Sequence, residues 1–144
     1  MITLISNQNI LELFPKMVSG LERAFQNTSI GSYWNMKLLV DHLVNREVYG
    51  FFEPESGYSG IFQFTYSPLA KTLNFFWSGK DPSNTTPVNW DLIDTFLTAI
   101  AQAEGCKFIT CEGRPGWKKI LESRGYTTDS VLFTKEVSHE SPPV

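Results

Sequence analysis

Two side-chain types that often build reactive sites are scarce in this chain of 144 residues. It has only two cysteines, Cys106 and Cys111, and two histidines, His42 and His139. They show no ligand spacing typical of zinc and no convincing Cys/His pair for nucleophilic catalysis, so we expect no metal site. On a predicted strand, the five-residue separation of the cysteines points them to opposite faces, which argues against a disulfide. We expect both to be free thiols that pack in the core as small apolar side chains.

Basic clusters and long apolar runs are also missing. The net charge is −3 at pH 7 and the pI is near 5.3, which argues against binding through many nucleic-acid phosphates. No stretch reaches the length of a membrane span, and the N-terminal residues lack the charged and apolar regions of a secretion signal. We therefore expect a cytoplasmic protein that binds neither nucleic acid nor membrane.

What the chain does contain is apolar and aromatic side chains, which make up 42% and 14% of its residues. At this length they suffice for one domain with a hydrophobic core. The sequence shows no internal repeat and no linker. We predict a single domain over residues 1–137, followed by a flexible polar tail over residues 138–144.

The spacing of apolar residues changes along the first half of the chain. Residues 2–5 favour a short strand, and helical spacing follows over residues 10–25, with Pro15 in the first turn. A second helix is predicted over residues 32–47, with Ser32 as its cap. Alternation then predicts an antiparallel meander of three strands, in residues 47–53, 58–66 and 71–77.

The second half begins with an irregular segment, residues 78–89, which is rich in turn-forming residues. Asn89 is predicted to cap a helix that Gly105 ends. Three further elements follow: a strand over residues 106–112, a loop and short helix over residues 113–126, and a last strand over residues 127–137. This order predicts an α/β domain with a mixed, mostly antiparallel sheet of about six strands and helices on both faces.

The stretch "GRPGWKKILESRGY", residues 113–126, carries the most specific pattern, a tight loop followed by a short amphipathic helix. Together with the element order over residues 1–137, it resembles the GNAT superfamily of coenzyme A-dependent N-acyltransferases. The stretch is similar to a variant common in GNAT-like proteins of tailed bacteriophages. The resemblance implies a GNAT-like enzyme that transfers an acetyl group from acetyl-CoA to an unidentified amine, in the host cytoplasm or a virion if a phage encodes it.

The phosphate-binding loop of the family is altered here. Its pattern, Gln/Arg-x-x-Gly-x-Gly/Ala before the long helix, corresponds to "NTTPVN", residues 84–89, which has neither glycine. Pro87 also removes one backbone amide donor. In place of the glycine amides, Thr85, Thr86 and Asn89 offer hydroxyl and amide donors to the cofactor.

The proton-transfer groups implied by the resemblance are two glutamates. When Gly125 is matched to the glycine that ends the fourth helix of the family, Leu121 stands where a thiolate-protonating tyrosine is usual. Glu53 and Glu112, each at the end of a predicted strand, are the candidate general bases, and Glu112 is preferred because it adjoins the glycine loop. The alternative for each is a solvated glutamate at a strand end.

Arg114 and two tryptophans are the remaining candidates for cofactor contacts. The resemblance places Arg114 near the mouth of the cleft, where its guanidinium would contact a coenzyme A phosphate or an acidic substrate group. Its alternative role is to bind local carbonyl groups or Glu112. Trp77 and Trp90 flank the irregular segment, so one of them is a candidate lining of the pocket, with core packing as the alternative.

A function without catalysis is the competing hypothesis. The altered loop, the missing tyrosine and the many aromatic side chains are also compatible with a GNAT-shaped assembly or interaction module that binds phage or host proteins. The partner under the first hypothesis is a small-molecule or protein amine. A third possibility is an α/β ligand-binding domain of another family.

Overall fold

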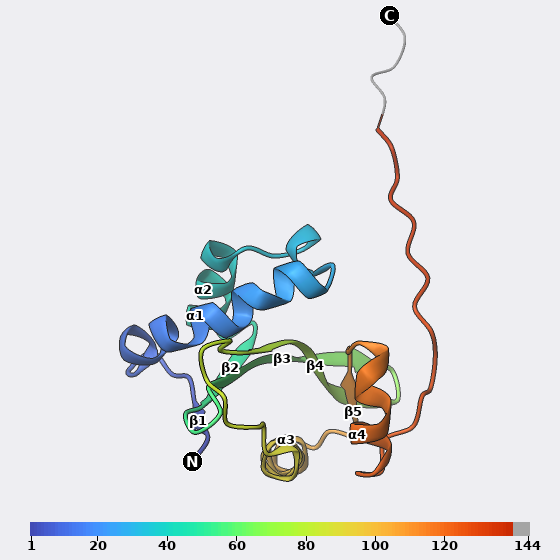
Figure 1. Ribbon diagram of the computed structural model, residues 1–144. Coiled ribbons are helices and arrows are strands. Elements are labelled where there is room, and N and C mark those ends of the chain that lie inside the picture. Colours follow the sequence, from blue (N-terminus) through green and yellow to red (C-terminus); the bar gives the residue numbers. More distant parts are fainter. Residues whose placement is uncertain (140–144) are drawn as a thin grey trace, which may run out of the picture.

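One sheet of five strands, in the order β1-β2-β3-β4-β5, organises the chain in a computed structural model that describes residues 1–139 (Figure 1). The strands are β1 (Thr3–Leu4), β2 (Tyr49–Glu53), β3 (Tyr58–Ser67), β4 (Ala70–Lys80) and β5 (Phe108–Cys111). Neighbouring strands from β1 to β4 are antiparallel, whereas β5 is parallel to β4. The predicted meander and the parallel crossover are confirmed, but the sheet has five strands and not about six.

Helices cover both faces of this sheet, as predicted for the α/β class. The helices are α1 (Ile10–Asn27), α2 (Met36–Val44), α3 (Trp90–Ala103) and α4 (Lys118–Glu122), with 3₁₀ turns at Ile30–Ser32 and Pro115–Trp117. Helices α1 and α2 lie on one face and α3 on the other, and α4 is joined to α3 by an Arg124–Asp91 ion pair (Figure 1). In the described part of the chain, no helix has the length and apolar character needed to cross a membrane.

The alternating side chains of β3 separate two hydrophobic clusters. Ile61 belongs to the cluster under α1 and α2, which includes Met17 and Leu21, whereas Phe62 belongs to the cluster under α3, which includes Leu97. All five side chains are buried. Since burial of each large apolar side chain contributes about 1.5–3 kcal/mol, these two clusters supply the main stabilisation of the sheet and its helices.

A bulge in β4 changes the direction of its side chains where the strand approaches the candidate site. Ile61 pairs with Trp77 and Phe62 with Phe75, which leaves Phe76 as an extra residue on β4. As a result, Phe76 and Trp77 both pack on the α1 side, although Phe75 faces the α3 side. The bulge lies next to the point where β4 loses its neighbour.

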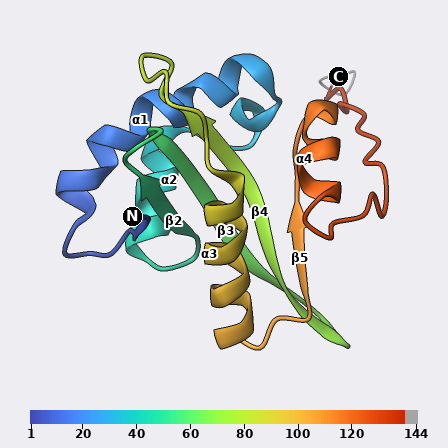
Figure 2. The same cartoon turned by 60° about the horizontal axis from the view of Figure 1, so that its bottom comes forward.

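Beyond that point β4 and β5 diverge, which Figure 2 shows as a widening separation between the two strands. Their last pair is Phe75 with Cys111, and the N–H of Glu112 donates to the carbonyl oxygen of Phe75 at 3.0 Å. From there β4 continues to Lys80, whereas β5 has ended. Within residues 1–139, the backbone of β4 therefore has no strand partner on this side over its last residues.

Two helix boundaries differ from the sequence predictions. Helix α1 begins at Ile10, so Pro15 lies in the second turn and not in the first, because the Ile10 N–H already donates to the carbonyl oxygen of Ser6 at 3.0 Å. Helix α2 is capped by Asn35 and not by Ser32, since the Asn35 side chain accepts from the Leu38 N–H at 2.8 Å.

The start and the end of α3 agree with the sequence predictions. The Asn89 side chain accepts from the Leu92 N–H at 3.1 Å, and Gly105 beyond the end has a φ of 70°, in the left-handed region.

The predicted last strand, residues 127–137, is not formed. Residues 127–139 have no regular structure: the segment passes the large cleft, where Leu132 and Thr134 belong to the lining, and then extends away from the helices and strands (Figure 1). The alternation in this segment is suitable for a strand, but a strand also needs a neighbour to accept its hydrogen bonds, and the tail has none here. The predicted flexible tail, residues 138–144, lies outside the described residues from residue 140 onward.

Candidate active site

A cleft of about 750 Å³ occupies the space where β4 and β5 diverge. One wall consists of the last residues of β4, from Phe76 to Lys80, together with the end of α1. The other wall consists of Glu112–Arg114 after β5, Trp117, and Leu132 and Thr134 of the C-terminal segment. The N-terminal end of α3 lies at the base of the cleft with Trp90. A cleft of this size, between a strand edge and a helix N-terminus, is suitable for a large polar ligand.

The β4 wall is aromatic and fixed in the core. Trp77 is buried, and its Nε1–H donates to the carbonyl oxygen of Leu21 at 3.0 Å. Trp34 packs against Phe76 and Trp77, with ring centroids 5.7 and 6.2 Å apart. Trp77, a candidate from the sequence, therefore both lines the cleft and packs in the core.

The opposite wall carries two charged side chains without partners. Glu112 and Arg114, both candidates from the sequence, line the cleft. Both are exposed, and within residues 1–139 neither side chain forms an ion pair or a hydrogen bond. The structure thus does not show the alternative role, in which the Arg114 guanidinium binds Glu112 or local carbonyl groups.

The charges around the cleft have an excess of cations. Its charged lining residues are Arg23, Lys80, Glu112 and Arg114. Three positive side chains against one carboxylate create a potential that favours an anionic ligand. Within the described residues, no group of three or more His, Cys, Asp and Glu side chains could hold a metal ion.

Tyr58, which the sequence analysis did not select, contributes a buried hydroxyl group to the cleft. Its side chain is 3% exposed, and its Oη has no hydrogen-bond partner among the described residues. Its ring packs edge-on against Trp90 of α3 at a centroid distance of 5.3 Å. Burial raises the pKa of Tyr58 far above its usual value; the Ser78 side chain lies near enough to lower this pKa slightly but forms no hydrogen bond of normal geometry, so the hydroxyl keeps its proton.

A buried hydroxyl without a partner costs stability and is rare in native proteins, which makes Tyr58 a functional candidate. The sequence did contain a signal for it. Tyr58 lies on the same predicted strand face as Phe62 and Phe64. A hydroxyl group at the buried end of an apolar face needs either a hydrogen-bond partner or a function.

Glu53, the other candidate base, lies outside the cleft lining. Its carboxylate is buried and accepts hydrogen bonds from the backbone N–H groups of Glu55 and Ser56. The Ser56 hydroxyl donates to it as well, at 2.7 Å. All of these bonds close the turn between β2 and β3, so the carboxylate of Glu53 is engaged in the fold.

The predicted cofactor residues of the loop before α3 are also outside the lining. Thr85 and Thr86 are exposed, and the Thr86 N–H donates to the Asn84 side chain at 2.9 Å. The Asn89 side chain is engaged as the cap of α3. Of this region, Val88 and Trp90 line the cleft.

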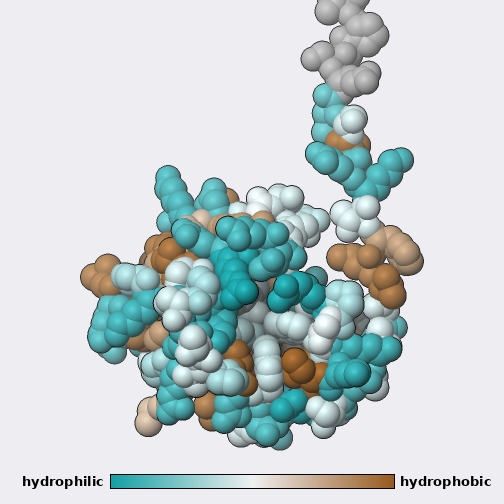
Figure 3. Space-filling model, viewed as in Figure 1, coloured by the Kyte–Doolittle hydropathy of each residue, from teal (hydrophilic) through white to brown (hydrophobic). Residues whose placement is uncertain are grey.

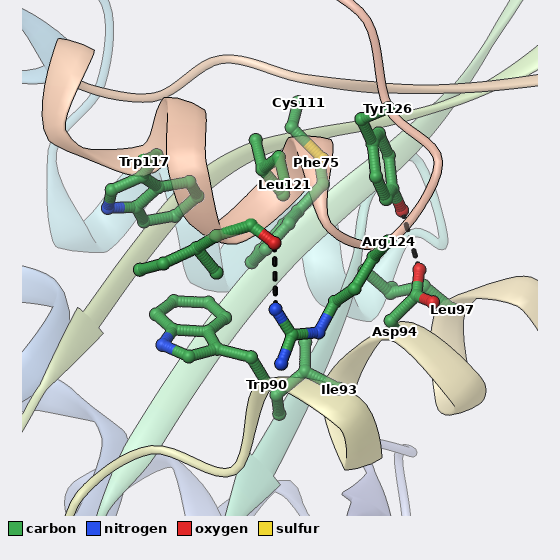
Figure 4. A pocket seen from close by; sticks show the side chains of 11 residues that line it. Phe75, Trp90, Ile93, Asp94, Leu97, Cys111, Trp117, Leu121, Arg124 and Tyr126 are labelled. Carbon is green, nitrogen blue, oxygen red and sulfur yellow. Dashed lines mark hydrogen bonds between the residues drawn. The ribbon is translucent and has the colours of Figure 1, made fainter.

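A second, much smaller pocket of about 20 Å³ lies between α3, β5 and α4 (Figure 4). Residues just after α4 hold its walls together. Arg124 binds Asp91 at 2.9 Å and the carbonyl oxygen of Ile120 at 2.7 Å, and the Tyr126 hydroxyl donates to Asp94 at 3.0 Å. This volume holds at most about one water molecule, so the pocket joins α4 to α3 and offers no substrate site.

Both cysteines are free, as expected, but they do not point to opposite faces. Cys106 precedes β5, and both side chains pack against the α3 cluster. Burial raises the pKa of the Cys111 thiol to about 11, so at neutral pH it is not a nucleophilic thiolate.

Comparison with known proteins identifies the fold. No protein-family model matches the chain, and no curated protein sequence is significantly similar to it. Solved structures do match. A probable acetyltransferase has a TM-score of 0.70 at 12% identity, covering 98% of this chain and 99% of its own.

Two further solved structures agree with that match. A ribosomal-protein-alanine N-acetyltransferase from Brucella melitensis has a TM-score of 0.66 at 12% identity, over 95% of this chain and 99% of its own. An aminoglycoside acetyltransferase from an uncultured soil metagenomic sample has a TM-score of 0.68 at 11% identity, over 97% of this chain and 96% of its own. The chain therefore has the fold of the GNAT acetyltransferases along nearly its whole length.

Proposed function

We propose that the protein is an N-acetyltransferase that binds acetyl-CoA between β4 and β5 and transfers the acetyl group to an amine. The observation that carries this proposal is the cleft itself, because it combines an unpaired strand edge, an excess of cations, a free carboxylate and a buried tyrosine hydroxyl. The GNAT fold supports it.

The cleft offers suitable partners for both parts of coenzyme A. Beyond Phe75, the β4 backbone has no strand partner on its β5 side, so amide groups of the pantetheine arm have donors and acceptors to bind. The cations of Lys80 and Arg114 are suitable for the phosphates. They take the place of the missing glycine amides, and Thr85 and Thr86 are left out of our proposed phosphate site.

The chemical roles are assigned to two residues, Glu112 just after β5 and Tyr58 on β3. The amine nitrogen bonds to the acetyl carbonyl carbon as the carbon–sulfur bond breaks, and Glu112 accepts the proton that the amine loses. Tyr58 donates a hydrogen bond from its hydroxyl to the leaving thiolate, the role for which Leu121 is unsuitable, and the thiolate takes its proton from water. Glu53 is not part of this set, because its carboxylate is engaged in a turn.

The acceptor amine enters from the α1 side of the cleft. This side is lined by Arg23, Tyr33 and Trp34, beside Phe76 of the bulge. Neighbours with this fold include an enzyme named for a ribosomal protein and one named for aminoglycosides, so the fold alone does not select the amine. Screening a panel of small-molecule and peptide amines is the direct way to find it.

The test begins with calorimetric titration of the full chain with acetyl-CoA and with free coenzyme A. Micromolar binding of both is expected, and Arg114→Ala should weaken it about 10-fold by removing a charged hydrogen bond to phosphate. Glu122→Ala is the matched surface control on α4 and should bind normally. No heat at millimolar ligand would contradict the proposal and favour the non-catalytic alternative, a GNAT-shaped assembly or host-interaction module.

Catalysis is tested next with an active amine, by measuring thiol release. Tyr58→Phe should lower kcat about 100-fold, with unchanged acetyl-CoA affinity, because the substitution removes only the hydrogen bond to the leaving thiolate. Its stability should stay the same or rise, since the hydroxyl has no partner. Full activity of this variant would eliminate Tyr58 as the group that stabilises the thiolate, while leaving the binding result intact.

A further inference from the structure

One cation of the cleft is not needed for the phosphates of coenzyme A. Lys80 and Arg114 are assigned to them, whereas Arg23 on α1 also lines the cleft and has no assigned role. Its side chain is exposed, and within residues 1–139 it forms no ion pair or hydrogen bond. In Figure 3, hydrophilic (teal) and intermediate (white) residues predominate on the surface between α1 and α4. A free guanidinium in such a lining is available to an anionic group of a ligand.

Helix α1 runs backwards along β4. Gly20 of the helix is in contact with Gly79 near the end of the strand, where a Cβ on either glycine would overlap the other's carbonyl oxygen. Further along the helix, Phe25 packs on Trp77, which is an earlier residue of β4, with ring centroids 5.5 Å apart. The C-terminal part of α1 therefore extends from the end of β4 towards the place where β4 and β5 diverge.

This direction separates Arg23 from the cation at the end of β4. Arg23 is three residues beyond Gly20, and side chains at this spacing share one face of a helix. Along β4 it is therefore displaced from Lys80 towards the divergence, where Glu112 directly follows the last residue pair of β4 and β5. Since Glu112 is the proposed base, an anion bound by Arg23 belongs to the acceptor and not to the phosphates of the cofactor.

The α1 side of the cleft also offers a fixed aromatic surface. Trp34 is half-buried, and its ring lies against Phe76 at a centroid distance of 5.7 Å. The Trp34 N–H donates to the carbonyl oxygen of Ile30 at 3.0 Å, which holds the turn after α1. Both rings line the cleft, so an apolar group of a ligand gains free energy when it covers them.

We propose, on the basis of the acetyl transfer assigned above, that the acceptor is an amino acid with an apolar side chain. Arg23 binds its carboxylate, and the side chain lies on Trp34 and Phe76. One guanidinium matches the single charge of a carboxylate through two parallel hydrogen bonds, whereas a phosphate dianion would need a second cation. The excess of cations in the cleft also disfavours a polyamine. Arg23 thus determines specificity and takes no part in bond formation.

The first experiment measures thiol release by the full chain with acetyl-CoA and pairs of amines. Phenylalanine, leucine and methionine are each compared with their amides, at about pH 9, where much of each amine is neutral. For at least one pair, kcat/KM should be about 10-fold or more higher for the amino acid. Equal rates within every pair, no acetylation of any amino acid, or faster acetylation of spermidine or phosphoethanolamine would overturn the proposal. Failure to bind acetyl-CoA would overturn the proposed function together with it.

Variants of Arg23 then test the carboxylate contact. Arg23→Ala should raise KM for the amino acid about 10–100-fold, with KM for its amide and the Kd of acetyl-CoA unchanged, because only the contact to the carboxylate is lost. Arg23→Lys keeps the charge but not the planar fork, so its KM should be intermediate.

Lys16→Ala is the matched control, since Lys16 is an exposed cation of α1 outside the cleft lining, and its KM values should be normal. An unchanged KM for the amino acid in Arg23→Ala would overturn the proposal. Weaker binding of acetyl-CoA in this variant, as expected for Arg114→Ala, would assign Arg23 to the cofactor and would overturn it as well, while leaving the proposed acetyl transfer in place.

Discussion

The two walls of the cleft are built very differently. β4 is paired with the whole of β3, Tyr58–Ser67. Helix α1 packs so closely on β4 that a Cβ at Gly79 would overlap the carbonyl oxygen of Gly20. On the other side, β5 is a short edge strand, and no residue of α4 is buried. One wall is therefore part of the core, and the other is a thin layer held mainly by α3.

This difference separates stability from function. The fixed wall supplies aromatic surface, the unpaired β4 edge and the cations Arg23 and Lys80, whereas the thin wall carries Glu112 and Arg114, which form no ion pair within residues 1–139. Segments with few buried contacts open most readily, and binding groups are often found there. We expect substitutions in the β4 wall to change the free energy of unfolding and those in the β5 wall to change ligand binding.

The largest expected effect is at the contact between α1 and β4. Gly79→Ala should lower the free energy of unfolding by about 3 kcal/mol, because the new methyl group forces the two backbones apart. Gly116→Ala is the matched change on the other wall, where a Cβ would meet nothing within 4 Å, and it should have almost no effect. Urea unfolding of both variants measures the contrast, and equal losses would mean that the two walls are equally packed.

A smaller contrast is expected from two leucines. Leu21→Ala empties a fully buried position of α1 and should cost about 2–5 kcal/mol in the free energy of unfolding. Leu121→Ala, on the half-buried face of α4, should cost about 1 kcal/mol, because water already reaches that position. If urea unfolding gave the same loss for both, α4 would belong to the core after all.

The fixed half of the molecule was also the more predictable half. Side-chain alternation in β3 and the cap at Asn89 are local patterns, so the sequence alone indicates them. The bulge at Phe76 depends on the register between β3 and β4, and no local pattern specifies that register. For this reason the sequence placed Trp77 near the pocket but could not show that it is also anchored to α1.

The candidate site was predicted in part for a related reason. Glu53 and Glu112 have the same local context, a strand end, and only the fold shows that Glu53 is engaged in a turn while Glu112 faces the cleft. The role of Tyr58 depends on the absence of a partner, which is a property of the packed structure. The last strand was predicted from its pattern, but its formation depends on a neighbouring edge, which the pattern does not contain.

The smallest change in stability, and the most direct probe of the thin wall, is expected at Arg124. Its ion pair with Asp91 joins α4 to α3 at the surface, where such pairs contribute about 0–1 kcal/mol, so Arg124→Gln should hardly alter unfolding. The same pair keeps α4 over Cys111, whose thiol pKa is raised to about 11 by burial. At pH 8 only about one thiol in a thousand is therefore ionised, and alkylation by iodoacetamide should be slow.

Loosening α4 should change that rate even though the fold persists. In Arg124→Gln, water reaches Cys111 more often, its pKa falls towards the usual value, and its alkylation should accelerate several-fold, with Cys106 in the same molecule as the reference. In the unaltered chain the rate at Cys111 should instead rise about tenfold per pH unit between pH 8 and 10, as the thiolate fraction does. Mass spectrometry of the two peptides gives both rates. An unchanged rate at Cys111 in Arg124→Gln would mean that α4 is held as firmly as α1, and the contrast between the two walls would then rest on the β5 edge alone.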